Sequence, residues 1–175
     1  LIQTSITEDE YQKDLVLSSP LRALDCPPIS DGASAMIIAS EDEAFNFSSN
    51  PIWIKGIDHR IETSNLGARN LSSSPSIKSA MKSLDIENTA FDIAEIHTQF
   101  SHEYPFLRKL LNLENVPTNL SGGPLVGNVM MAAGLDAIGK VYEQLSTNSY
   151  KRGLAHATSG PCLQHNMLVS LEKNS

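Results

Sequence analysis

The sequence is poor in cysteine, in basic residues and in long apolar runs, and each shortage excludes a class of protein. The 2 cysteines, Cys26 and Cys162, could form at most one disulfide and lack the CxxC spacing of zinc or redox sites. We therefore expect a reduced intracellular setting and no metal site. Only 13 lysines and arginines stand against 20 acidic residues, a net charge of −7 in 175 residues. Without a basic stripe to contact phosphates, nucleic acid is not an expected partner.

The missing apolar runs exclude a membrane span, because a helix needs roughly 20 consecutive apolar residues to cross a bilayer. The length is that of one domain. The chain starts at Leu1, without the basic stub and apolar segment of a secretion signal. We interpret it as a piece of a longer protein.

The first 50 residues are polar and carry short elements. Thr7, followed by Glu10 at capping-box spacing, predicts a helix over about 8–16. The small apolar residues of 34–39 predict a buried strand, and 41–44 a polar helical turn. A linker follows at 46–50.

From Pro51 onward, hydrophobic periodicity predicts an α/β domain in which helices are layered on a mixed β-sheet. The expected order is β-α-β-α-α-β-β: strands at 52–61, 91–96, 152–158 and 166–172, and helices at 75–84, 102–112 and about 128–146. The last helix is apolar nearly all round, which predicts that it is largely buried. Its Gly134 and Gly139 predict close packing against another element.

Three segments place polar residues where a strand or a buried helix meets a loop. Glu95-Ile-His97-Thr-Gln-Phe100 ends a strand, where ligands usually bind in α/β sheets; a hydrogen-bonded structural histidine is the alternative. Ser121-Gly-Gly-Pro-Leu-Val-Gly-Asn128 offers free backbone N–H groups before a helix; a plain tight turn is the alternative.

The third segment, His156-Ala-Thr-Ser-Gly160, puts an acid/base group beside a flexible turn. Cys162 follows closely, and we expect a buried, inert thiol, because nothing nearby in the sequence would activate it as a nucleophile. Each of the three segments is a weak signal alone.

In their order along the chain, these segments resemble the C-terminal half of the thiolase superfamily, especially its sterol-carrier-protein-x-type and archaeal lipid-transfer-like branches. Pro20-Leu-Arg-Ala-Leu-Asp-Cys26 with Asp31-Gly-Ala-Ser-Ala35 is similar to the stretch that closes the N-terminal half. The three segments above are similar to the Asn-Glu-Ala-Phe (or His-Asp-x-Phe), Gly-His-Pro and Cys-x-Gly blocks. The resemblance covers nearly the whole chain.

The resemblance implies that residues 1–45 are the tail of the N-terminal thiolase half and that 51–175 form the C-terminal thiolase domain. In that family the nucleophilic cysteine lies in the first half, and neither cysteine here matches it. The fragment alone is therefore expected to be inactive.

The resemblance also assigns roles. His97 matches the position that holds an oxyanion-hole water, and His156 matches a second acid/base. Ser121, Gly122, Gly123 and Gly160 border the substrate and CoA. Asn128 stands where most thiolases have the histidine that activates the nucleophile; its amide can donate a hydrogen bond but cannot take a thiol proton.

For the full-length protein the resemblance implies an acetyl-CoA acetyltransferase-type acyltransferase of lipid metabolism, which makes or breaks C–C bonds in acyl-CoA thioesters. Coenzyme A thioesters are the expected substrates, with no permanently bound cofactor. A cytoplasmic homo-oligomer, at least a dimer, is expected, and a small accessory subunit is an open alternative. Because of Asn128, an aldolase or lyase of thiolase fold and a catalytically silent acyl-CoA-binding subunit also stay open.

Overall fold

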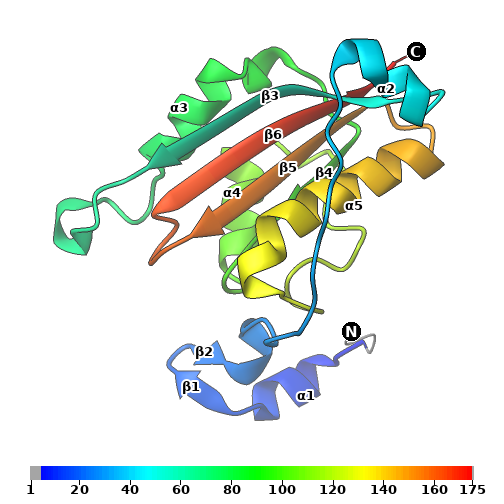
Figure 1. Cartoon of the computed structure of the whole chain (residues 1–175). Helices are drawn as coiled ribbons and strands as arrows, with labels where there is room; N and C mark the ends of the chain where they lie inside the picture. The colour runs from blue at the N-terminus through cyan, green and yellow to red at the C-terminus, as the bar shows by residue number, and fades with distance from the viewer. Residues whose placement is uncertain (1–4, 175) are drawn as a thin grey trace.

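The computed structural model describes residues 5–174 and contains a four-stranded mixed sheet (Figure 1). The strand order is β3-β6-β5-β4; β4 runs parallel to β5, and the other two pairs are antiparallel. Its strands are β3 Ile52–Ile61, β4 Ile93–Ile96, β5 Arg152–Ser159 and β6 His165–Lys173. The predicted α/β class and mixed sheet are confirmed, and the strand bounds differ from those expected by two residues or fewer.

Helices cover both faces of this sheet (Figure 1). On one face lie α3 Pro75–Ser83 and α4 Glu103–Leu110, and on the other lies α5 Ala133–Thr147. Each layer buries its own apolar cluster, with Ile77, Leu107 and Leu154 in the first and Val141 and Val169 in the second. Burial of these side chains is the main force that holds the layers together.

Helix α3 follows its local sequence signals closely. Pro75 occupies the first turn of α3, where its missing N–H costs nothing, and the Ser74 side chain accepts a hydrogen bond from the Ile77 N–H. The loop at 63–74 holds one 3-10 turn. Within residues 5–174, the 3-10 turns are Ala23–Asp25, Leu66–Ala68, Ile86–Asn88 and Met130–Ala132.

The prediction of a largely buried helix over about 128–146 is wrong in two respects. The α-helix begins only at Ala133, after a 3-10 turn, and only one of its faces is buried. Met131 is one of the apolar residues from which all-round burial was predicted, yet it is 99% exposed. A Cβ at Gly134 would lie 3.2 Å from the Ala157 side chain, as expected from close packing, whereas Gly139 faces open space.

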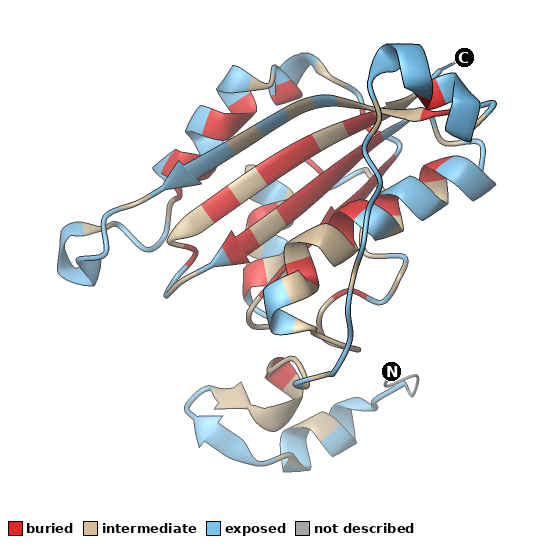
Figure 2. Cartoon of the chain, viewed as in Figure 1, coloured by how far each residue is buried: buried red, intermediate tan, exposed pale blue. Residues whose placement is uncertain are grey.

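The buried strand predicted at 34–39 is also wrong for this chain. Residues 31–39 carry no secondary structure, and Figure 2 shows most of this segment exposed. Ile37 and Ile38 are 85% and 68% exposed. Figure 1 shows this segment crossing the α5 side of the sheet toward the short helix α2, Glu41–Phe47. A strand requires a neighbour to pair its backbone groups, and within residues 5–174 none adjoins this segment.

At the N-terminus, α1 spans Glu8–Lys13 with the predicted Thr7 capping box, but it is shorter than the expected 8–16. The residues that follow form β1, Val16–Ser18, which pairs with β2, Leu21–Arg22. The β-branched Val16 suits a strand better than a helix end. Among the described residues, no helix has the length and apolar character needed to traverse a lipid bilayer.

Candidate functional site

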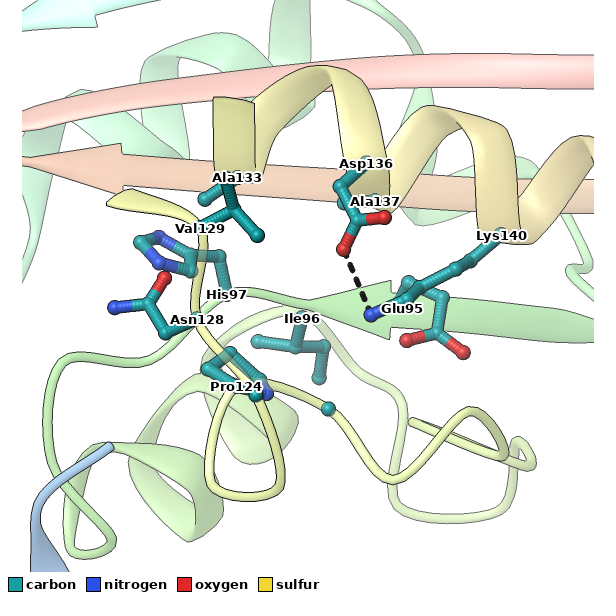
Figure 3. A pocket seen from close by; sticks show the side chains of 12 residues that line it. Glu95, Ile96, His97, Pro124, Asn128, Val129, Ala133, Asp136, Ala137 and Lys140 are labelled. Carbon is teal, nitrogen blue, oxygen red and sulfur yellow. Dashed lines mark ion pairs between the residues drawn. The ribbon is translucent and has the colours of Figure 1, made fainter. Parts of the chain in front are cut away.

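A small pocket lies where β4 ends, between the loop that precedes α5 and the first turns of that helix (Figure 3). Its cavity volume is about 20 Å³, room for about one water molecule. The lining residues are Glu95, Ile96, His97, Gly123, Pro124, Gly127, Asn128, Val129, Ala133, Asp136, Ala137 and Lys140. Three of the sequence-predicted site residues, His97, Gly123 and Asn128, therefore meet in one pocket.

His97 follows β4 directly, and one nitrogen of its ring is hydrogen-bonded to the backbone of β5. Its Nδ1 lies 3.1 Å from the carbonyl oxygen of Thr158 on β5, whereas Nε2 has no hydrogen-bond partner among residues 5–174. The Thr158 N–H lies 3.4 Å from the same nitrogen, so Nδ1 contacts both backbone groups of Thr158 and Nε2 is the ring nitrogen that faces the pocket. Burial lowers the pKa of His97; contacts with Asn128 and Thr158 partly offset this shift. The ring is neutral at pH 7 and can accept a hydrogen bond.

Asn128 reaches the pocket from the loop before α5. Figure 3 shows its side-chain amide facing the His97 ring. The Asn128 Oδ1 atom is buried and has no hydrogen-bond partner in the described part of the chain. Two unsatisfied polar atoms at one small cavity are an arrangement that favours a polar ligand atom, because buried polar groups without partners cost free energy.

The glycine turn before Asn128 is fastened to the edge of β4. The Asn119 side chain hydrogen-bonds to the backbone of Ile96 as a neighbouring strand would. Its Oδ1 accepts from the Ile96 N–H at 2.7 Å, and its Nδ2 donates to the Ile96 carbonyl at 3.1 Å. Gly122 and Gly123 have φ values of 93° and 64°, which favour glycine. A Cβ at Gly123 would lie 2.6 Å from Asn119 Nδ2. These glycines therefore allow the clamp on Ile96.

Ser121 supports the pocket from outside it. Its hydroxyl donates to a carboxylate oxygen of Glu95 at 2.7 Å and accepts from the Gly123 N–H at 3.2 Å. Glu95 itself is only 2% exposed, and burial raises its pKa, although the hydrogen bonds from Ser121 oppose this shift. Ser121 and Gly122 therefore shape the pocket without lining it.

Sequence reasoning gave no role to three charged residues of the pocket wall. Asp136 and Lys140 form an ion pair of 2.8 Å on the side of α5 that faces the pocket, and Glu95 lies near them (Figure 3). The signals were present: an acidic residue in an apolar strand, and opposite charges four residues apart on a helix.

The structure does not place His156 in the pocket. Its ring is 1% exposed, and its Nε2 lies 3.1 Å from Oδ1 of Asn166. The Asn166 amide nitrogen donates to Ser76 on α3 and to the Leu163 carbonyl, so the Asn166 oxygen must accept from His156. Burial lowers the pKa of His156 to about 4. Side chains alternate along β5, and this one faces the α3 layer, away from α5.

Gly160 and the two cysteines also lie outside the pocket. Gly160 has a φ of 71° in the turn between β5 and β6, and its carbonyl accepts from the Gln99 side chain at 3.1 Å. Cys162 is exposed, contrary to the buried thiol that was expected, and Cys26 is half-buried; both are free. Among residues 5–174, no group of three metal-ligating side chains comes together.

Comparison with solved structures defines the fold class. The chain superposes on human mitochondrial 3-ketoacyl-CoA thiolase with a TM-score of 0.74 and 23% identity, covering 97% of this chain and 43% of that one. The same enzyme in a complex with CoA matches with a TM-score of 0.69 and 22% identity, again over 97% and 43%. This is a thiolase fold, and the chain corresponds to part of it.

Curated relatives carry the likeness into the sequence. The acetyl-CoA acetyltransferase of Methanothermobacter thermautotrophicus is 26% identical over 93% of this chain and 48% of its own length. The mitochondrial 3-ketoacyl-CoA thiolase of Bos taurus is 27% identical over 77% of this chain and 33% of its own. No family model matches. The resemblance to thiolases is confirmed: this is a partial thiolase-like chain, which spans half or less of the length of the curated relatives it matches.

Proposed function

We propose that the full-length protein is a thiolase-like acyltransferase that makes or breaks C–C bonds in acyl-CoA thioesters. The observation that carries the proposal is the pocket at the end of β4, where His97 and Asn128 present unsatisfied polar atoms. The chain around that pocket is similar to acetyl-CoA acetyltransferases and 3-ketoacyl-CoA thiolases. Thioester chemistry passes through an oxyanion, which hydrogen-bond donors in this pocket would stabilise: the amide N–H of Asn128 and a water held by His97.

His97 stabilises the oxyanion through a water molecule. The Thr158 backbone holds Nδ1, and Nε2 of the neutral ring, which faces the pocket, accepts one hydrogen of that water. The other hydrogen of the water is then directed at the thioester oxygen. Asn128 contributes an N–H donor from its amide beside the same oxygen. Two positioned donors of this kind are worth several kcal/mol of barrier, about 2.7–4 each where single donors have been removed.

Asn128 donates hydrogen bonds but takes no proton at neutral pH. Activation of the nucleophilic thiol therefore comes from groups outside residues 1–175. His156 has no part in the proton transfer, because it is buried on the opposite face of the sheet.

The substrate is a coenzyme A thioester, and the proposal needs no permanently bound cofactor. Gly123 presents its backbone to the pocket, and Ser121 and Gly122 hold it there. The Gly160 carbonyl accepts a hydrogen bond from the side chain of Gln99, which lies two residues after His97. Gly160 therefore borders the approach to the site.

Residues 1–45 are the tail of an N-terminal half, and 51–175 are the C-terminal domain. The unpaired extended segment with its exposed Ile37 and Ile38 supports this division, since strands of the missing half would pair with it and cover it. The nucleophile lies in that half, so the 175-residue piece is inactive alone. The intact enzyme is a cytoplasmic homo-oligomer that acts in lipid metabolism. An alternative form of the proposal adds a small accessory subunit to this oligomer.

One residue favours a second candidate function. Asn128 removes the base that ordinary thiolysis requires, which favours a thiolase-fold lyase or aldolase, or a silent subunit that binds acyl-CoA. The two candidates differ upstream of Leu1, where only the acyltransferase needs a cysteine at the nucleophile position.

The deciding experiment incubates the full-length protein with CoA and a short 3-oxoacyl-CoA and follows loss of the 3-oxo thioester. Turnover by the wild type supports the acyltransferase. Binding of CoA without turnover, and activity gained by Asn128→His, would favour the silent subunit; absence of both turnover and CoA binding would overturn the proposal.

A further inference from the structure

Ser30, far from the pocket in sequence, is joined to Asn128 by a reciprocal pair of hydrogen bonds. The Ser30 N–H donates to the Asn128 carbonyl at 3.1 Å, and the Asn128 N–H donates to the Ser30 hydroxyl at 3.2 Å. Ile29 and Asn128 form an isolated parallel bridge at the same place. The backbone of Asn128 is thus held on both sides by one serine.

The same N-terminal segment is also anchored near His97. Asp25 is buried; its carboxylate accepts from the Ser101 hydroxyl and, at 2.9 Å, from the Tyr11 hydroxyl. The Ser101 N–H donates to the Asp25 carbonyl at 2.9 Å. Ser101 lies in the turn between His97 and α4. Residues 25–30 therefore connect the two loops that carry the unsatisfied polar atoms of the pocket.

Packing beyond Ser30 leaves little freedom at this contact. A Cβ at Gly32 would lie 2.7 Å from a methyl carbon of Val129, so the chain passes close to the residue after Asn128. Ser30 itself does not line the pocket.

We infer that Ser30 is a positioning residue: by fixing the backbone of Asn128, it holds the side-chain amide against the His97 ring. The inference concerns the geometry of the pocket, and only its kinetic readout rests on the proposed function. Removing the hydroxyl would leave the Asn128 N–H without an acceptor while keeping the Ser30 N–H donor. The loop could then shift, and small misplacements of reacting groups are costly.

Loss of this position has an electrostatic signature at His97. The contact with Asn128 raises the pKa of His97, against the larger effect of burial, so a displaced Asn128 lets that pKa fall further. Other titratable or polar groups lie around the same ring and have no contact with Ser30. They are Glu103 at the start of α4, Lys140 and Asp136 on α5, Glu95 on β4, and His156 and the Thr158 carbonyl on β5.

The test is carried out on the full-length protein with Ser30→Ala, Ser30→Thr and the matched control Ser34→Ala, whose side chain has no hydrogen bond among the described residues. NMR titration of the labelled His97 ring is expected to give a lower pKa in Ser30→Ala. The wild-type value is expected to return in Ser30→Thr, which keeps a hydroxyl. On a short 3-oxoacyl-CoA, kcat is expected to fall about tenfold in Ser30→Ala at unchanged KM.

Identical His97 titration and kcat in Ser30→Ala and Ser34→Ala would overturn the inference. A shifted and Thr-restored titration in a protein with no turnover would support the positioning role while the proposed function fails. If Ser30→Ala does not fold, Ser30→Cys, which keeps the size but accepts hydrogen bonds weakly, takes its place with the same expectations.

Discussion

His97 and His156 are joined through their backbones, yet their imidazoles lie on opposite sides of the sheet. The His97 N–H donates to the His156 carbonyl at 3.1 Å, where β4 and β5 end their parallel pairing. The His97 ring faces the pocket beside α5, and the His156 ring reaches Asn166 and the α3 layer. Of the two histidines that the sequence offered for chemistry, one lies at the pocket and the other belongs to the core.

The core role of His156 predicts acid sensitivity. Its folded-state pKa of about 4 lies below the unfolded value, so the unfolded state binds the proton more tightly. Stability is full above about pH 6.5 and is lost as the pH falls toward 4, by about 3 kcal/mol in all and about 2 kcal/mol between pH 7 and pH 5. Urea unfolding of the full-length protein at these two pH values measures the loss.

His156→Gln is expected to unfold more easily at pH 7 but to lose that pH dependence. His102→Gln, at an exposed histidine, is the matched control and should keep it. An unaltered difference between pH 7 and pH 5 in His156→Gln would contradict the assignment.

The Ser121 hydroxyl stabilises the buried Glu95 carboxylate. Ser121→Ala removes its donor at 2.7 Å, and we expect a loss of about 1–3 kcal/mol, because a buried carboxylate is left short of hydrogen bonds. Denaturant unfolding checks this against Ser146→Ala, an exposed serine of α5 that should change stability by less than about 0.5 kcal/mol. Equal effects of the two variants would show that the Glu95 contact is unimportant.

The glycine turn predicts a steric effect. An alanine at Gly123 would need a positive φ and would collide with the Asn119 amide that clamps Ile96. Gly123→Ala should therefore destabilise the protein by about 1–3 kcal/mol, whereas Gly67→Ala, in an exposed loop at ordinary φ, should be close to neutral. Thermal unfolding of both variants tests the pair, and a neutral Gly123→Ala would count against the clamp.

Gly139 tests the proposed N-terminal half. It faces open space in this chain, where alanine would stabilise a helix by about 0.5–1 kcal/mol. If the missing half covers this face of α5, Gly139→Ala in the full-length protein instead destabilises it through overpacking. A stabilised full-length variant would mean that the face stays exposed.

The sheet and its helices were predictable from local signals, because caps, prolines and hydrophobic periods act within a few residues. Strand 52–61 and the helix starting at Pro75 are of this kind. The predicted strand at 34–39 and the predicted all-round burial of 128–146 are absent, because within residues 5–174 no strand pairs with the first segment and nothing covers the outer face of the second. Met131 and Ile37 are apolar but exposed, because no other described residue covers them.

The site residues also fall into those that local sequence signals predict and those that they do not. His97, Gly123 and Asn128 could be predicted to lie near one another because they stand in short ordered segments, and they line one pocket; their roles stay predictions. His156 could not be judged from sequence, since one step along a strand decides which face a side chain takes. Ser30 lies 98 residues from Asn128 and carries no local signal of their contact.

In the proposed function, the His97 pocket stabilises the oxyanion of an acyl-CoA thioester. The most direct test is the kcat of full-length His97→Ala on a short 3-oxoacyl-CoA, with the KM for CoA measured in parallel. If His97 holds the water that stabilises the oxyanion, kcat falls by about 10²–10³ with little change in KM. A kcat equal to that of the wild type would contradict it.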